Sequence, residues 1–191
     1  VVSDLAYGAL GYQGYENPSF LSTPGAKDVG IEFYTFSKTF NMAGWRLAFA
    51  AGDAQKIEAL NLIQDHLFVG IFPALQEAGI AALFDPKSEE AVAQLNATYD
   101  SRRDAFVQTA SKIGWQAFPS RGSFYAWMPV PEGYTSESFA DLLLEKVHVA
   151  VAPGKGFGPA GDAYVRIGLL VEPERLVEAV NRIANLHLFN N

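Results

Sequence analysis

The first half of the chain alternates short runs of β-branched and aromatic residues with segments of helical spacing. The short runs predict strands at residues 1–8, 31–37 and 47–51. Residues 11–25 are rich in Gly, Pro, Asn and Ser, which favours a long irregular loop. Asp53 is a suitable N-cap for a helix whose apolar residues share one face: Ile57, Leu60, Ile63 and Leu67. Strands that alternate with helices in this way are typical of a parallel α/β sheet.

Helical spacing dominates the middle of the chain. Pro73 opens a predicted helix that runs to Phe84. Asp85-Pro86 then supplies a cap and an N1 proline for a long helix that ends near Gly114. Its apolar positions lie three, four or seven apart: Val92, Leu95, Tyr99 and Phe106.

The pattern changes again after Gly114. Four further strands are predicted, at residues 115–118, 122–129, 149–152 and 163–170. Two helices are predicted as well, at residues 136–146 and from Pro173 onward. The Gly-rich segment 153–162 lacks the spacing of a phosphate-binding loop, so we interpret it as a flexible connection. We therefore expect two domains, residues 1–85 in a parallel α/β unit and residues 86–191 in a smaller α+β unit.

Composition and charge exclude several classes of protein. The 191 residues carry a formal net charge of −7 and no cysteine. The chain has no basic stripe for nucleic-acid phosphates and no run approaching the roughly 20 apolar residues that span a bilayer. Three scattered histidines show no ligand spacing, so we predict no metal site. The absence of cysteine and of a secretory signal is consistent with a cytoplasmic location.

The first residues suggest a longer parent protein. Val1-Val2-Ser3-Asp4 lacks an initiator Met and begins inside an apolar strand, whereas natural amino termini are usually exposed and polar. We therefore expect this chain to be the carboxy-terminal part of a longer protein.

Lys38 directly follows the predicted strand 31–37 and is the first candidate for chemistry. An arbitrary lysine at such a position is usually a surface residue. However, Thr35 and Ser37 place hydroxyls beside it and Arg46 follows in the next segment. Hydroxyls and a guanidinium suit a phosphate dianion, and a neighbouring lysine can form a Schiff base with an aldehyde.

Three further polar side chains are candidates because they lie in or at the end of apolar strands. Asp4 is either a turn residue or a carboxylate that holds a pyridine nitrogen protonated. Tyr7, three residues on, could donate its hydroxyl to a ring oxygen. Arg166 either points to solvent or offers a bidentate contact to a substrate carboxylate.

Together these segments resemble the class I/II aminotransferases, which are fold-type I enzymes that depend on pyridoxal 5′-phosphate (PLP). The resemblance rests on four segments: Asp4-Leu5-Ala6-Tyr7, Ser37-Lys38-Thr39-Phe40, Gly44-Trp45-Arg46 and Tyr164-Val165-Arg166-Ile167. It covers essentially the whole chain. It implies the carboxy-terminal part of the large PLP-binding domain, with a mainly parallel sheet and helices, at residues 1–85. Residues 86–191 would then be the small α+β domain with its connecting helix.

The resemblance also implies a role for each candidate residue. Lys38 would bind PLP covalently and act as the general base, with Asp4 at the pyridinium nitrogen and Tyr7 at the phenolic oxygen. Thr35, Ser37 and Arg46 would bind the phosphate, and Arg166 the α-carboxylate of the substrate. Amino acids and 2-oxo acids would be the substrates, and the full-length protein would be a homodimer.

Two later segments narrow the resemblance to one bacterial branch. Residues 122–131 and 149–158 are similar to those of N-acetyl-LL-diaminopimelate aminotransferases of lysine biosynthesis, a branch with other members that use alanine, aspartate or methionine-type substrates. Family members are about twice this length. Two alternatives therefore stay open: a carbon–sulfur lyase or decarboxylase on the same scaffold, or a non-catalytic fragment that binds no cofactor.

Overall fold

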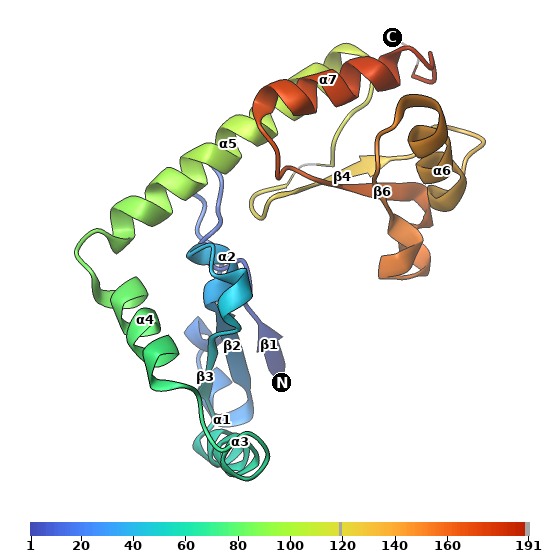
Figure 1. The fold of residues 1–191 in the computed structure, drawn as a ribbon. Coiled ribbons are helices and arrows are strands. Elements are labelled where there is room, and N and C mark those ends of the chain that lie inside the picture. The colour runs from blue at the N-terminus through green and yellow to red at the C-terminus, as the bar shows by residue number, and fades with distance from the viewer. Residues whose placement is uncertain (119, 190–191) are drawn as a thin grey trace. The chain divides into compact units, whose positions relative to one another are not determined.

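The chain divides into two compact units in a computed structural model that describes residues 1–118 and 120–189. The first unit comprises Val1–Asn96 and the second begins at Ala97 (Figure 1). The division falls inside the long helix α5, Ser88–Lys112, and not at residue 85 as the sequence indicated. The first turns of α5 belong to the first unit because Asn96 donates a hydrogen bond to the carbonyl of Ala9 at 2.9 Å. The assignment of the units to a large and a small domain stays a prediction.

The first unit combines a small sheet with short and long helices (Figure 1). Its strands are β1 (Val2–Asp4), β2 (Ile31–Thr35) and β3 (Ala48–Gly52). Its α-helices, besides the start of α5, are α1 (Ala26–Val29), α2 (Phe36–Thr39), α3 (Ala54–Leu67) and α4 (Pro73–Phe84). Two 3₁₀ turns are η1 (Phe20–Ser22) and η2 (Ala43–Trp45). This mixture of strands and helices confirms the α/β class.

The sheet order is β1-β2-β3, with one parallel and one antiparallel pair. β1 runs parallel to β2, as predicted, but β2 and β3 are antiparallel. The register places Thr35 opposite Ala48, so the chain between them folds straight back. A parallel partner would need a longer crossover connection, usually with a full helix. The expectation of a parallel pair here was therefore wrong, and the sheet is mixed.

Helix α4 lies close to the chain around β2 and β3 because its contact position is a glycine. A Cβ on Gly79 would lie 2.7 Å from Cδ2 of Leu47, closer than real Cβ contacts. Leu47 belongs to a buried cluster with Phe36 and Met42, and Ala78 and Ala82 of α4 pack against it. α3 begins after Asp53, whose side chain accepts a hydrogen bond from the backbone N–H of Lys56 at 3.0 Å, so the predicted cap is confirmed.

Both long helices of the first unit also carry exposed apolar side chains. Six of them are more than 40% exposed: Leu62, Ile63 and Leu67 of α3, and Ile80, Leu83 and Phe84 of α4. Of the four residues predicted to form the apolar face of α3, Ile57 and Leu60 are half-buried and Ile63 and Leu67 are exposed.

The second unit is built on an antiparallel sheet. Its strands are β4 (Tyr125–Pro129), β5 (Ala152–Pro153) and β6 (Tyr164–Gly168), in the order β4-β6-β5. Its helices, besides the rest of α5, are α6 (Ser136–Val147) and α7 (Pro173–Ala184). The segment between β5 and β6 forms two 3₁₀ turns, η3 (Gly154–Phe157) and η4 (Pro159–Ala163). This arrangement fits the expected α+β unit.

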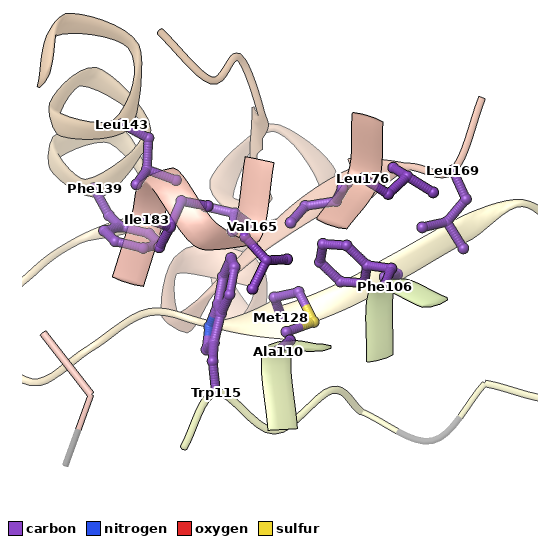
Figure 2. Packing of buried hydrophobic residues seen from close by; sticks show 13 residues of the cluster. Phe106, Ala110, Trp115, Met128, Phe139, Leu143, Val165, Leu169, Leu176 and Ile183 are labelled. Carbon is purple, nitrogen blue, oxygen red and sulfur yellow. The ribbon is translucent and has the colours of Figure 1, made fainter. Parts of the chain in front are cut away.

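One apolar core holds the second unit together (Figure 2). Figure 2 shows Trp115 between the side chains of α5, α6 and the sheet, among them Phe106, Phe139 and Met128. The Trp115 indole N–H donates to the carbonyl of Pro129 at 2.7 Å, which satisfies its polar atom inside the core. The segment 115–118 was predicted as a strand but is irregular, with one hydrogen bond from Phe118 N–H to Trp127 O at 2.9 Å. Burial of the indole explains its apolar pattern without a strand.

Every helix formed by residues 1–118 and 120–189 is too short or too polar to span a lipid bilayer.

A buried carboxylate ties the first loop to the sheet of the first unit. Glu32 on β2 accepts hydrogen bonds from the Ser19 hydroxyl at 2.6 Å, the Phe20 N–H at 2.8 Å and the Ser3 hydroxyl at 2.9 Å. Burial alone would raise the pKa of Glu32, but these three donors stabilise the ionised form, so its pKa lies below the ordinary value of 4.5. The ionised form therefore contributes stability at neutral pH.

We expect Glu32→Gln to lower the free energy of unfolding by about 2 kcal/mol at pH 7, because an amide cannot accept from all three donors. The difference from wild type should shrink as the pH falls from 4.5 through the lower pKa of the folded carboxyl group, where the wild-type carboxylate becomes protonated too. Denaturant titrations between pH 7 and pH 3 measure both effects, with the exposed Glu16→Gln as the control. A Glu32→Gln penalty that does not change with pH would contradict this role.

Candidate active site

The turn between β2 and α2 fixes the direction of Lys38. The strand predicted to reach Ser37 ends at Thr35, and residues 36–39 form one helical turn instead. Thr35 is the N-cap of this turn, since its hydroxyl accepts from the N–H of Ser37 at 3.2 Å. Phe36 and Thr39 are buried on one side of the turn, which leaves Lys38 on the other side, half-buried.

The buried side of the turn is anchored by a hydrogen bond as well as by packing. The hydroxyls of Tyr34 and Thr39 lie 2.7 Å apart, and Phe36 packs in the cluster with Leu47 and Met42. Lys38 is thus carried by a turn that is fixed at its start, on its buried face and at its end.

Five of the predicted site residues line one cavity of about 490 Å³: Asp4, Thr35, Ser37, Lys38 and Arg46. The remaining lining residues are mostly apolar and small: Val2, Ala6, Phe33, Tyr34, Ala43 and Ala48. Asp4 lies at the end of β1 and is paired in register with Phe33 of the parallel strand β2. The carboxyl ends of neighbouring parallel strands form the usual ligand-binding edge of an α/β sheet. The structure therefore brings these five residues together at that edge.

The hydroxyls of Thr35 and Ser37, beside Lys38, differ in their hydrogen bonds within the protein. The Thr35 hydroxyl donates to Ser37 Oγ at 2.9 Å and lies 3.4 Å from the carbonyl of Leu47. Thr35 is therefore first a cap of the turn, and phosphate contact by its side chain stays a prediction. Ser37 accepts from Thr35 and keeps its own hydroxyl proton for a ligand.

Arg46 is held in an unusual backbone conformation. It has φ 54° and ψ 43°, the left-handed region that non-glycine residues seldom occupy. Its guanidinium is exposed and donates from Nη1 to the carbonyl of Ala43 at 2.9 Å. Strain of this kind persists where surrounding structure imposes it, and it occurs often at ligand sites.

Tyr7 adjoins the lysine without lining the cavity. Its ring centroid lies 6.0 Å from Nζ of Lys38, at the outer limit of a cation–π contact. The contact between the two side chains fits the expectation that both act on the same ligand group, while the role of the Tyr7 hydroxyl stays a prediction.

Arg166 belongs to the second unit, on the central strand β6. Its guanidinium carbon lies 4.1 Å from the ring centroid of Tyr125 and 4.2 Å from that of Phe157. The Arg166 side chain is half-buried and contacts both rings, and its role as a carboxylate-binding residue stays a prediction. These two aromatic residues were not identified from the sequence. The only signal for Phe157 is its position between glycines in a loop without the phosphate-binding spacing.

The side chains around the first cavity fit PLP. Ser37 and Arg46 offer donors for a phosphate dianion, Lys38 an amine for the aldehyde, and Asp4 a carboxylate for the pyridinium nitrogen. The volume lies within the range of about 300–1,000 Å³ common for cofactor sites. The apolar lining residues suit the faces of an aromatic ring.

Comparisons with known proteins give matches to aminotransferases. A family model described as aminotransferase class I and II matches residues 1–183. The chain is 58% identical over 189 residues to the L-glutamine–4-(methylsulfanyl)-2-oxobutanoate aminotransferase of Bacillus subtilis, covering 99% of this chain and 47% of the relative. It is 48% identical over 183 residues to the LL-diaminopimelate aminotransferase of Moorella thermoacetica, covering 96% of this chain and 46% of the relative.

Solved structures show the same likeness. The apo structure of BacF from Bacillus subtilis superposes with a TM-score of 0.92 at 44% identity, covering 100% of this chain and 48% of that one. An aminotransferase from Staphylococcus aureus gives a TM-score of 0.93 at 39% identity, covering 99% of this chain and 50% of that one. The chain thus spans about half the length of the relatives it matches.

Replacing Arg46 separates its backbone strain from its charge. We expect Arg46→Gly to leave the free energy of unfolding unchanged or to raise it by up to about 1 kcal/mol, because glycine adopts a positive φ without strain. The same variant should bind PLP roughly 10- to 100-fold more weakly through loss of a charged hydrogen bond to the phosphate. Arg46→Ala, which keeps the strain, is the matched control for stability. Denaturant unfolding and PLP titration of the whole protein give the two readings, and undiminished PLP affinity in both variants would contradict the phosphate role.

Proposed function

The chain belongs to the class I and II aminotransferases, a family of PLP-dependent enzymes, and on that premise we propose that the whole protein transfers an amino group from an amino acid to a 2-oxo acid. The observation that carries the proposal is the convergence of Lys38, Asp4, Ser37 and Arg46 on one cavity. Because this chain spans about half of its relatives, the activity is assigned to the whole protein.

The proposed roles follow from the position of each side chain. Bound PLP supplies an aldehyde for amine exchange and a ring that withdraws electrons from the substrate Cα. Nζ of Lys38 holds the cofactor covalently and, once free, moves the proton at the substrate Cα. The carboxylate of Asp4 keeps the pyridine nitrogen protonated.

Arg46 and Ser37 orient the cofactor by its phosphate, and Thr35 supports them by capping the turn that carries Ser37 and Lys38. Tyr7 donates toward the phenolic oxygen of the ring. Arg166 binds the α-carboxylate of the substrate with its guanidinium edge.

Among oxo acids, we place 4-(methylsulfanyl)-2-oxobutanoate first, with glutamine as the amino donor. The support is the 58% identity to the Bacillus subtilis enzyme of that name, against 48% and 45% to two LL-diaminopimelate aminotransferases. LL-diaminopimelate is the second candidate donor, and its N-acetylated form, indicated by the resemblance of residues 122–131 and 149–158, is the third.

The names of the relatives bear on the type of reaction. The relatives are named as aminotransferases, which favours transamination over a lyase or decarboxylase reaction.

We also propose that the whole protein is a homodimer. The support is that several large apolar side chains on α3 and α4 are exposed in this chain and would be buried by contact with further protein.

Lys38→Ala should abolish covalent attachment of PLP and lower turnover by about 10²- to 10⁴-fold or more, because the proton-transfer group is lost. The visible absorbance of the protein-bound cofactor and the rate of amino transfer measure the two effects. Lys27→Ala, at an exposed lysine on α1, is the control and should behave as wild type. Transamination retained in the Lys38 variant would refute the assignment.

The substrate proposal predicts a preference that a panel of substrates measures. With 4-(methylsulfanyl)-2-oxobutanoate as acceptor, glutamine should give a kcat/KM at least about tenfold above that of LL-diaminopimelate or its N-acetyl form. Amino acid and oxo acid products should form in equal amounts. With methionine in the panel and no oxo acid, release of ammonia and a thiol would instead identify a lyase, and a reversed preference would favour the diaminopimelate enzymes.

A further inference from the structure

Two aromatic rings lie against the Arg166 guanidinium. Tyr125 from β4 and Phe157 from η3 lie within about the same distance of its central carbon, 4.1 and 4.2 Å from the ring centroids. In the described part of the chain, no hydrogen-bond acceptor or carboxylate pairs with the Arg166 side chain. A guanidinium that packs against aromatic rings presents its N–H edge to an anion.

Phe157 is held in place by further rings although it is 52% exposed. Its ring meets that of Trp127 edge to face, with centroids 5.8 Å apart, and Trp127 stacks on Tyr164 at 5.4 Å. An exposed phenylalanine in a loop would normally gain little from its position. Here Phe157 is the end of a row of three rings, with Trp127 and Tyr164, and its own ring contacts Arg166.

The loop that carries Phe157 is fixed and is not the flexible connection that its composition suggested. Its turns approach so closely that a Cβ on Gly154 would lie 2.2 Å from the carbonyl oxygen of Gly161. The buried Ser136 hydroxyl at the start of α6 donates to Asp162 Oδ1 at 2.8 Å and accepts from the N–H of Lys155 at 3.2 Å. These bonds reach both ends of the segment, so the loop places Phe157 in a defined position.

We propose that Phe157 is a positioning residue for carboxylate recognition: with Tyr125 it holds the Arg166 guanidinium so that its N–H edge meets the substrate carboxylate. This inference rests on the proposed function, which assigns the carboxylate to Arg166. Contact with both rings orders the long side chain before the substrate arrives, and binding then loses less conformational freedom. Removing the Phe157 ring removes one of the two ring contacts and lets the guanidinium rotate away from its bidentate geometry.

The test uses the PLP-loaded whole protein and three substitutions. Phe157→Leu removes the ring but keeps an apolar side chain, Phe157→Tyr keeps the ring, and Phe118→Leu changes an equally exposed phenylalanine (58%) outside the row. The measured quantities are the dissociation constant and maximal rate of the first amino transfer from glutamine, followed by the absorbance change of the cofactor. Phe157→Leu should raise the dissociation constant roughly 3- to 30-fold, the range of one cation–π contact, with little change in maximal rate. Phe157→Tyr and Phe118→Leu should match wild type.

Two comparisons separate positioning from general damage to the fold. A primary amine that lacks the α-carboxylate should react equally slowly with wild type and Phe157→Leu, since it does not use Arg166. In an Arg166→Ala background, Phe157→Leu should add no further loss. A Phe157→Leu protein with wild-type affinity for glutamine, or an equal loss with the primary amine, would overturn the inference.

Failure of the inference is distinguishable from failure of the proposed function. A wild-type protein that shows bound PLP and amino transfer but no effect of Phe157→Leu refutes the positioning role alone. A wild-type protein that takes up no PLP refutes the proposed function and this inference with it.

Discussion

The hydrogen bond from the Ser37 N–H to the Thr35 hydroxyl is the interaction on which the candidate site depends. It ends β2 and starts the single turn that carries Lys38. One helical turn places its first and fourth residues on one side, so burial of Phe36 and Thr39 directs Lys38 to the other. Buried neutral groups therefore determine the side of the turn from which the lysine projects. Gly79 adds to this, because it lets α4 pack directly against Leu47 under the turn.

In the second unit, neutral aromatic side chains hold the cationic side chain of Arg166. Arg166 is flanked by the rings of Tyr125 and Phe157, and the loop that supplies Phe157 is tied to α6 by the buried Ser136. Neutral rings flank the Arg166 side chain, so its charge remains available to a ligand. A carboxylate partner within the protein would instead compete with a substrate or cofactor anion.

Residues that cap or open a helix allowed the starts of several helices to be predicted from the sequence. Asp53, Pro73 and Pro173 mark helix starts that the structure confirms, because caps and N1 prolines act within one turn. The segment 31–37 was extended too far, since Phe36 and Ser37 suit a strand as well as a capped turn. The antiparallel direction of β3 depends on how the chain folds back between Thr35 and Ala48, which no local pattern records.

Some features of the candidate site could be predicted from the sequence and others could not. Lys38, Asp4 and Arg46 could be selected from their positions near predicted strands, and the structure places them around one cavity. The N-cap role of Thr35 and the two rings around Arg166 could not be selected. The cap depends on a hydrogen bond within the turn. The two rings come from the neighbouring strand β4 and from the loop that carries Phe157, which are far from each other in the sequence.

The central claim is that Lys38 is the residue that binds PLP covalently. Borohydride reduction of the PLP-loaded whole protein, followed by peptide mass spectrometry, locates the attachment directly. We predict a phosphopyridoxyl group on the peptide that contains Ser37-Lys38-Thr39 and at most traces on exposed lysines such as Lys27 and Lys56. A group located mainly on another lysine, or spread evenly among them, would contradict the account.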